Sequence, residues 1–307
     1  MDLLNVFHTT INGLIILSYL FVVLIIIRSK ATVFKNGFFS IFVATGIADI
    51  ASLFTNCTLR LIRELKLGEE TKEIALISSI ITYMALIAHL IGNMLITINR
   101  YSALCLMNKY DAIWTRRNVL IAVIVQYAVS FVLFAHVIRA NVEYIHNADG
   151  TVIIKSFREK QIDLIARFTC FGACIIYAAV SLSLNTRLLI EWKRLSKTNG
   201  VPLHGHQDKG LLLYTLLVFV CTMLVCSQQI VRTISILTEN TTLNLWIALQ
   251  YVWMNELMVN VAPFSLMVLS SDFRQEVFNL FRCSKHRSST SLFVAVPSTR
   301  RSAVKRF

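Results

Sequence analysis

Seven long apolar stretches occupy most of this chain of 307 residues. A helix of roughly 20 apolar residues crosses a hydrocarbon core about 30 Å thick. The stretches that meet this requirement are approximately 9–27, 38–60, 74–98, 119–138, 162–186, 211–237 and 245–269. None shows the strand alternation of a membrane barrel, and the connections are too short to hold a second domain. The sequence therefore predicts an all-α membrane protein, a single bundle of seven transmembrane helices.

The distribution of positive charge predicts how this bundle is oriented. Charged residues make up only 15% of the chain, against about 25% in soluble domains. Twenty of the 30 Lys and Arg residues fall on the side of the C-terminus, and eight, among them Arg60, fall in loops on the other side. Because cytoplasmic loops are enriched in Lys and Arg, we expect the N-terminus outside and the C-terminus inside. The net charge of +13 is then a property of the cytoplasmic face and requires no nucleic-acid partner.

Several polar side chains interrupt the apolar stretches. Asp49 lies about 18 Å from the start of the second stretch, near the middle of the bilayer. Polar groups in hydrocarbon are costly, so we expect it to be paired or protonated. We group Asp49 with Asn93, Asn255 and Glu256 as an interior polar network, with Asn260 as a further candidate partner of Asp49. It acts either as an ion or proton switch or as an uncharged lock between helices.

The seventh stretch contains Pro263, the only proline within any of the seven, so a kink is expected there. Asn260 lies three residues earlier and can satisfy backbone groups that the proline frees. Glu256 is a second acid near the midplane. Either Arg232 reaches toward it from the sixth stretch, or the two side chains face separate wet surroundings.

The third stretch ends in Asn99, Arg100 and Tyr101, and the loop that follows contains Arg116 and Arg117. Basic residues flank membrane helices in general, so topology alone accounts for an arginine here. In a seven-helix frame the same residues are also candidates for coupling to a cytoplasmic partner. We keep both interpretations.

Polar and aromatic residues gather in the expected outer halves of several helices. They are Tyr83, Arg167, Gln228, Gln229, Arg232, Gln250 and Tyr251. Together they favour a pocket open to the outside, and the two arginines bias it toward anionic or strongly hydrogen-bonding ligands. The alternative for each residue is an ordinary interfacial aromatic or a helix-packing polar group.

The C-terminal region predicts a short amphipathic eighth helix. Residues 271–281 begin with Ser271 and Asp272 and carry phenylalanines at helical spacing, which is typical of an interfacial helix. Residues 1–282 are expected to form the seven-helix domain with its eighth helix, and 283–307 a disordered basic cytoplasmic tail. Cys283 is either a palmitoylation site or a reduced thiol. Asn240, in the sequon Asn240-Thr241-Thr242, is a candidate glycosylation site in a short outer loop. We expect no metal site and no cofactor.

Four passages carry a resemblance to a known family. They are Gly46-Ile47-Ala48-Asp49-Ile50, Asn99-Arg100-Tyr101-Ser102-Ala103, Asn108-Lys109-Tyr110-Asp111-Ala112-Ile113-Trp114 and Pro263-Phe264-Ser265 leading to Ser271-Asp272-Phe273-Arg274. With them the chain resembles the G-protein-coupled receptors across its membrane region, and more closely the nematode serpentine chemoreceptors of class V or the related class gamma. The resemblance implies a multi-pass plasma-membrane receptor, often in the sensory cilia of chemosensory neurons. Its partners would be a heterotrimeric G protein and a small odorant or pheromone, and it would not be an enzyme.

The resemblance also assigns roles to particular positions. Arg100 matches the arginine that stabilises the inactive bundle and then supports the G-protein tail. Asp49 matches the acid of the interior sodium or water network, and Asn260 and Pro263 match the switch of the seventh helix. The chain departs from the pattern at Asn99, where an acid usually pairs with the arginine. It also lacks a proline in the sixth helix and the cysteines of the usual outer disulfide.

A proton-coupled transporter of small solutes is the main alternative. Asp49 and Glu256 would then be the coupling acids. The sequence shows no inverted repeat and no pair of broken helices in corresponding positions, which disfavours this function.

Overall fold

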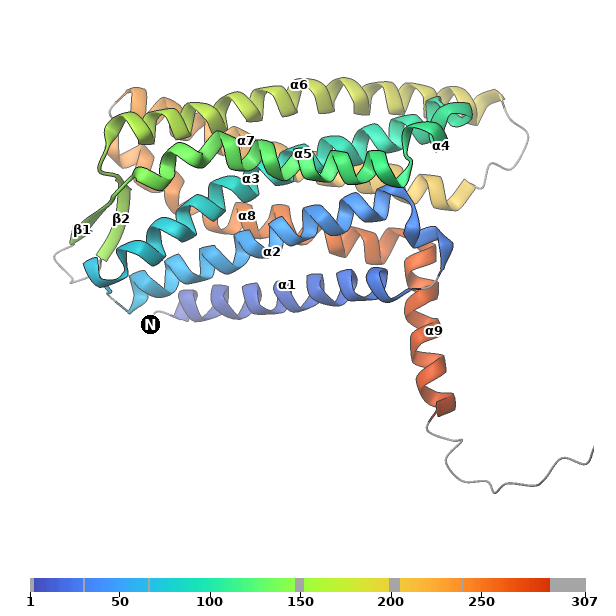
Figure 1. Cartoon of the computed structure of the whole chain (residues 1–307), viewed down its shortest axis with the longest axis horizontal. Helices are drawn as coiled ribbons and strands as arrows, with labels where there is room; N and C mark the ends of the chain where they lie inside the picture. The colour runs from blue at the N-terminus through green and yellow to red at the C-terminus, as the bar shows by residue number, and fades with distance from the viewer. Residues whose placement is uncertain are drawn as a thin grey trace, which may run out of the picture.

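The computed structural model describes residues 3–29, 31–65, 67–146, 152–198, 205–238 and 240–287, and this part is nearly all helical (Figure 1). The long helices are α1 (Leu3–Arg28), α2 (Gly37–Glu64), α3 (Lys72–Cys105), α5 (Arg116–Phe134), α6 (Lys160–Thr198), α7 (Gly205–Leu237) and α8 (Thr241–Leu269). They coincide in order with the seven predicted stretches. In the described residues six helices are long and apolar enough to cross a membrane, and α8 contributes a shorter apolar run, Trp253–Leu269. The predicted seven-helix bundle is confirmed.

Short elements connect these helices. They are η1 (Thr32–Lys35), η2 (Glu69–Thr71), η3 (Met107–Lys109), α4 (Tyr110–Ile113) and η4 (Ala135–Arg139). Side-chain caps fix where several helices begin, because each accepts a hydrogen bond from an otherwise unpaired N–H group. Asn36 caps α2, Thr115 caps α5 and Asn240 caps α8.

The two ends of the bundle carry different elements. The N-terminus of α1 lies at one end, and α4 and α9 (Ser271–Arg287) lie at the opposite end (Figure 1). We call these the N-terminal end and the α9 end. Their separation agrees with an odd number of crossings, and the assignment of the N-terminal end to the outside stays a prediction from charge.

The connection between α5 and α6 contains a hairpin that the sequence analysis did not predict. Strand β1 (Val142–His146) pairs antiparallel with β2 (Val152–Phe157), with an irregularity between Glu143 and Tyr144. Strands are favoured over a helix here because the two segments are rich in β-branched and aromatic residues. The hairpin lies at the N-terminal end (Figure 1).

A hydrogen-bonded acid anchors the hairpin to the start of α6. The backbone N–H and the side-chain amide of Asn141 donate to the carboxylate of Glu159, at 2.8 and 2.9 Å. These bonds favour the charged form, so they lower the pKa of that carboxyl below its ordinary value.

Helix α9 confirms the predicted eighth helix and is longer than expected, reaching Arg287. Phe273 is buried against the bundle, whereas Phe278 is exposed, as an interfacial helix requires. The Ser29 hydroxyl donates to a carboxylate oxygen of Glu276 at 2.7 Å and ties α9 to the end of α1. The side chain of Cys283 and residues 288–307 lie outside the described residues, so the palmitoylation site and the tail stay predictions.

The packing of the helices follows the residue types on each face. Large apolar side chains such as Phe54 and Val132 are exposed, as a lipid-facing surface requires. Small residues allow close approach in the interior. A side chain at Gly92 of α3 would place its Cβ 2.0 Å from the Thr45 hydroxyl of α2, so only glycine fits at this contact.

Candidate functional site

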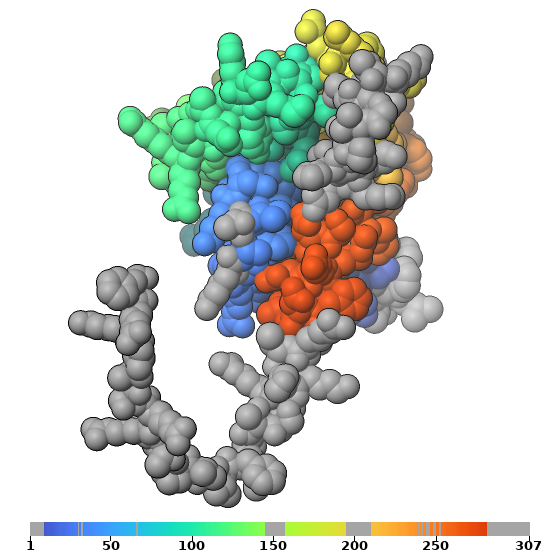
Figure 2. All heavy atoms as spheres, turned by 90° about the vertical axis from the view of Figure 1, so that its right-hand side faces the viewer, coloured from blue at the N-terminus to red at the C-terminus, as the bar shows by residue number. Residues whose placement is uncertain are grey.

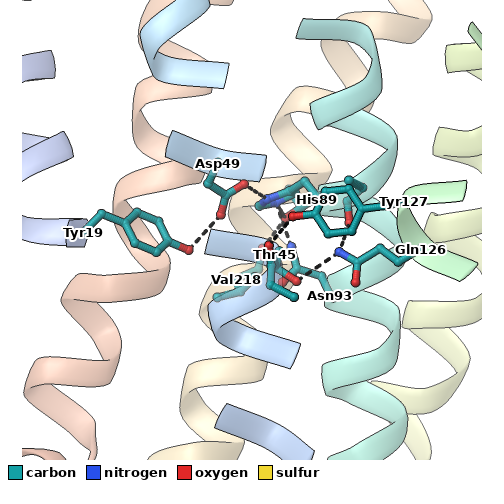
Figure 3. Close-up of polar contacts among 11 residues, drawn as sticks. Tyr19, Thr45, Asp49, His89, Asn93, Gln126, Tyr127 and Val218 are labelled. Atoms are coloured by element: carbon teal, nitrogen blue, oxygen red, sulfur yellow. Dashed lines mark hydrogen bonds and ion pairs between the residues drawn. The ribbon is translucent and has the colours of Figure 1, made fainter. Parts of the chain in front are cut away.

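The centre of the bundle holds a buried acid with two partners. Asp49, on α2, is 1% exposed. Its Oδ2 accepts a hydrogen bond from the Tyr19 hydroxyl of α1 at 2.8 Å (Figure 3). Its Oδ1 lies 2.6 Å from Nδ1 of His89 on α3, which is also buried. Sequence reasoning proposed asparagine partners for Asp49 and missed both Tyr19 and His89.

His89 extends this contact toward a fourth helix. Its Nε2 lies 2.7 Å from Nδ2 of Asn93 and 3.3 Å from the hydroxyl of Thr222 on α7. With the proton of the ring on Nδ1 toward Asp49, Nε2 accepts a hydrogen bond from the Asn93 amide. We call Tyr19, Asp49, His89, Asn93 and Thr222 the mid-bundle cluster. It joins α1, α2, α3 and α7.

Helix α5 supports the same level of the bundle. Gln126 donates from Nε2 to the Ala88 carbonyl at 2.8 Å and to the Thr45 hydroxyl at 3.3 Å. Tyr127 donates to the Ala44 carbonyl at 2.6 Å. These bonds fix the backbone of α2 and α3 beside the mid-bundle cluster (Figure 3).

The mid-bundle cluster does not fit the sodium ion that the resemblance implies for Asp49. A hard cation needs several oxygen ligands around it. Both oxygens of Asp49 face donors, the Tyr19 hydroxyl and the His89 ring nitrogen. Among the described residues no group of three or more His, Cys, Asp or Glu side chains is arranged to hold a metal. The imidazole stands where a cation would have to approach.

The second membrane acid, Glu256 of α8, has a partner that corrects the sequence analysis. Its Oε1 lies 2.9 Å from Nη2 of Arg60, and both side chains are buried. Arg60 was expected in an outer loop and Arg232 was the candidate partner. Instead α2 continues to Glu64, so Arg60 lies inside the bundle, where Glu256 balances its charge. One arginine fewer in the outer loops leaves the charge bias in the same direction.

The remaining residues proposed on the seventh helix lie close to this pair in sequence. Asn255 is buried and Asn260 is half-buried within α8. Pro263 is buried in the same helix. The described contacts of Asp49 go to Tyr19 and His89 instead, so the roles of Asn255, Asn260 and Pro263 stay predictions.

A second group of charged residues lies in the N-terminal half of the bundle. Arg167 of α6 donates from Nε to Oδ2 of Asp163 at 2.7 Å. Arg232 of α7 is half-buried and lies within electrostatic reach of Arg167, Tyr83 and Tyr251. We call Tyr83, Asp163, Arg167, Arg232 and Tyr251 the arginine cluster. It joins α3, α6, α7 and α8.

The arginine cluster keeps buried polar atoms without hydrogen-bond partners. They are Nη1 of Arg167, Nε of Arg232 and Oδ1 of Asp163. Tyr83 packs its ring 5.2 Å from that of Phe134 and 6.1 Å from that of Phe157, at the end of the hairpin. The cluster thus combines charged groups with neighbouring aromatic rings.

The three glutamines proposed for the pocket differ in their surroundings. Gln228 donates to the Ile247 carbonyl at 3.3 Å and leaves its own buried oxygen unpaired. Gln229 is buried on the same helix. Gln250 accepts a hydrogen bond from the indole of Trp253, which is exposed on α8. The structure therefore places Gln250 beside a surface tryptophan.

At the α9 end, Arg100 lies against an aromatic ring. Its guanidinium carbon is 4.0 Å from the centroid of the Phe38 ring on α2, which is a cation–π contact. Asn99 beside it is buried and donates to the Tyr110 hydroxyl at 3.2 Å. The Trp114 indole donates to Ser102 at 2.7 Å. Asn99 thus contributes to holding the loop with α4 against α3.

The basic residues of that loop face outward. Arg116 and Arg117 are exposed at the start of α5, and Tyr101 is half-buried. Figure 2 shows this end of the molecule, with the segment of α4 and the start of α5 at the upper left and α9 at the lower centre. Exposed positive charge on this face suits an acidic or anionic partner.

Comparison with known families agrees with this architecture. A family model described as serpentine type 7TM GPCR chemoreceptor Srv matches residues 9–283. The match includes most of α1, all of α2, α3 and α5–α8, and most of α9. No curated protein matches the chain significantly. The matched family is one of chemoreceptors and not of enzymes. The chain therefore belongs to the Srv family of serpentine seven-transmembrane chemoreceptors.

Proposed function

We propose that this protein is a plasma-membrane chemoreceptor that binds an external small molecule and activates a heterotrimeric G protein. The ligand binds at the arginine cluster, and the G protein binds at the α9 end. The observation that carries the proposal is the mid-bundle cluster, which connects four helices between these two regions. The same proposal places the protein in the cilia of chemosensory neurons, since the family is one of chemoreceptors.

Signalling would follow from a shift between two packings of the helices. Helix α7 carries Arg232 in its N-terminal-end half and Thr222 in the mid-bundle cluster, about 15 Å apart at 1.5 Å per residue. A ligand that moves Arg232 therefore acts on the contact between Thr222 and His89. Release of this contact would allow the helices at the α9 end to separate around Arg100.

Two modifications belong to this proposal. Asn240 is exposed directly before α8, where its side-chain oxygen caps the helix. A glycan would be attached to its amide nitrogen, which the cap does not use. Palmitoylation of Cys283 would attach α9 to the membrane surface.

Nucleotide exchange on a G protein tests the proposal. Membranes from cells that express the receptor are challenged with a panel of volatile and water-soluble small molecules. Arg100→Ala should abolish agonist-dependent exchange while surface expression is kept, because the guanidinium over Phe38 is lost. Arg28→Ala removes an exposed arginine at the end of α1 and should leave exchange unchanged. Equal exchange by Arg100→Ala and the unmodified receptor would contradict the proposal.

The transporter alternative loses support from the same structure. Each of the two candidate coupling acids has a basic partner, Asp49 with His89 and Glu256 with Arg60. A coupling acid has to face the path of the solute, whereas both of these side chains are buried in contacts between helices. Solute flux that persists in Arg100→Ala would be the result in favour of a transporter.

A further inference from the structure

We infer that the ligand of this receptor carries one negative charge, held between Arg167 of α6 and Arg232 of α7. The inference rests on the proposed function, because it names the chemical class of the molecule that the arginine cluster binds. A carboxylate is the simplest group of this kind.

The first argument is charge balance. The arginine cluster contains two guanidinium groups and one carboxylate, so it carries one excess positive charge. The side chains of Arg167 and Asp163 are only 7% and 15% exposed. Among the described acidic residues none lies within ion-pair distance of Arg232. An uncompensated charge among membrane helices is costly, and one bound monoanion removes that cost.

The second argument is the set of unpaired donors. Nη1 of Arg167 and Nε of Arg232 are buried N–H groups with no acceptor. Buried donors without partners are unfavourable, and guanidinium N–H groups make strong charge-assisted hydrogen bonds to carboxylates. Two donors from two helices suit one anionic group placed between them.

The third argument concerns which anions fit. Oδ1 of Asp163 is also buried and unpaired. It would repel a second negative charge close to the first, so the cluster favours a monoanion over a dianion. Next to the charged groups, the ring of Tyr83 packs on those of Phe134 and Phe157, and an aromatic surface of this kind suits the apolar body of a ligand.

A bound anion would also change the interaction between helices α6 and α7, because each of them carries one of the two arginines. Arg167 and Arg232 belong to different helices, and in the absence of an anion they repel each other. A bridging carboxylate turns this repulsion into an attraction between α6 and α7. Because α7 also holds Thr222 beside His89, binding of the charge reaches the mid-bundle cluster.

Matched acids and amides provide the test. The probes are benzoate with benzamide, hexanoate with hexanamide, the dianion succinate, and a panel of other aromatic and aliphatic carboxylates. The thermal unfolding of the purified full chain is measured with each probe, alongside nucleotide exchange in membranes. We expect stabilisation by monocarboxylates and little or none by the matching amides or by succinate. Equal stabilisation by acids and amides would overturn the inference.

Substitutions assign the effect to the two arginines. Arg167→Gln and Arg232→Gln should each weaken binding of the best monocarboxylate roughly 10- to 100-fold, as expected for loss of a charge-assisted hydrogen bond. Arg232→Lys keeps the charge and should recover part of the loss. Arg139→Gln, which removes an exposed arginine at the N-terminal end, is the matched control and should bind as the unmodified receptor does. Unchanged binding by Arg232→Gln would refute the assignment.

Two further arms separate this inference from the proposed function and from inorganic anions. The protein is kept in a chloride-free buffer, and chloride is then added. If chloride alone stabilises the protein and carboxylates add nothing further, the ligand assignment is overturned. Stabilisation by carboxylates without any nucleotide exchange would sink the proposed function and leave the inference standing. Exchange driven by amides and unaffected by Arg232→Gln would do the reverse.

Discussion

The mid-bundle cluster and the arginine cluster both bury charged side chains among apolar helices, yet they differ in how completely these charges are matched. Asp49 faces a hydroxyl and an imidazole, and the imidazole is itself held by Asn93. In the arginine cluster Arg167 has one carboxylate partner, and donors on both arginines stay unpaired. In the mid-bundle cluster, Asp49 and His89 therefore find their hydrogen-bond partners within the cluster itself. The arginine cluster has two guanidinium groups and only one carboxylate, so one positive charge lacks a counter-ion within the cluster.

This difference separates two uses of polar residues in a membrane. A matched set holds helices in register, because moving any helix breaks buried hydrogen bonds. An unmatched set is in its most stable form only when something else supplies the missing partner. Incomplete pairing in the half of the bundle away from α9 is therefore what we expect of a receptor site, and complete pairing at the centre is what we expect of the element that responds.

The largest effect should come from breaking the matched set at Asp49. Asp49→Ala leaves His89 and Tyr19 without their buried acceptor, and loss of one partner of a buried pair costs about 3–5 kcal/mol. We expect a large fall in the thermal unfolding temperature of the purified protein and in surface expression. Asp111→Ala, at an exposed position of α4, should show neither change. Equal unfolding temperatures for these two variants would contradict a stabilising role of the mid-bundle cluster.

A somewhat smaller effect is expected at the buried ion pair of Arg60 with Glu256. Glu256→Leu leaves the guanidinium of Arg60 buried and uncompensated, so it should destabilise the protein by about 2–4 kcal/mol. The double variant Arg60→Met with Glu256→Leu replaces both charges by apolar groups and should recover most of that loss. A double-mutant cycle from thermal unfolding measures the coupling. Additive effects would show that the two side chains do not stabilise each other.

The smallest effect, and the one of opposite sign, is expected in the arginine cluster. Arg232→Met removes the excess charge and relieves repulsion with Arg167, so without ligand the protein should be as stable as the unmodified receptor or more stable by up to about 1 kcal/mol. Thermal unfolding in a buffer without carboxylates measures this. Arg139→Met controls for loss of an exposed arginine. A destabilisation as large as that of Asp49→Ala would place Arg232 among the matched residues.

Much of the fold could be predicted from the sequence because lipid demands long apolar helices, and each of the seven appeared as such a stretch. The hairpin could not, because β1 and β2 are short and lie within a connection without a strong periodic signal. The end of α2 was placed too early, since an arginine at the edge of an apolar stretch usually marks the membrane surface. Arg60 is buried only because Glu256, distant in sequence, lies beside it.

The same reasoning applies to the candidate site. Asp49 and Asn93 stood out as polar residues in apolar stretches, whereas His89 was overlooked. Its position four residues before Asn93, on the same face of α3, was the available signal. No pattern could have paired Asp49 with Tyr19, because that contact depends on how α1 packs against α2.

The hydrogen bond between Asn99 and Tyr110 has a consequence for the conditions under which the resting receptor works. Where the family resemblance implies an acid, this chain has an amide that donates to a phenolic hydroxyl, so the contact is a hydrogen bond and not an ion pair. A change in ionic strength, which screens interactions between charges, should therefore leave this contact intact.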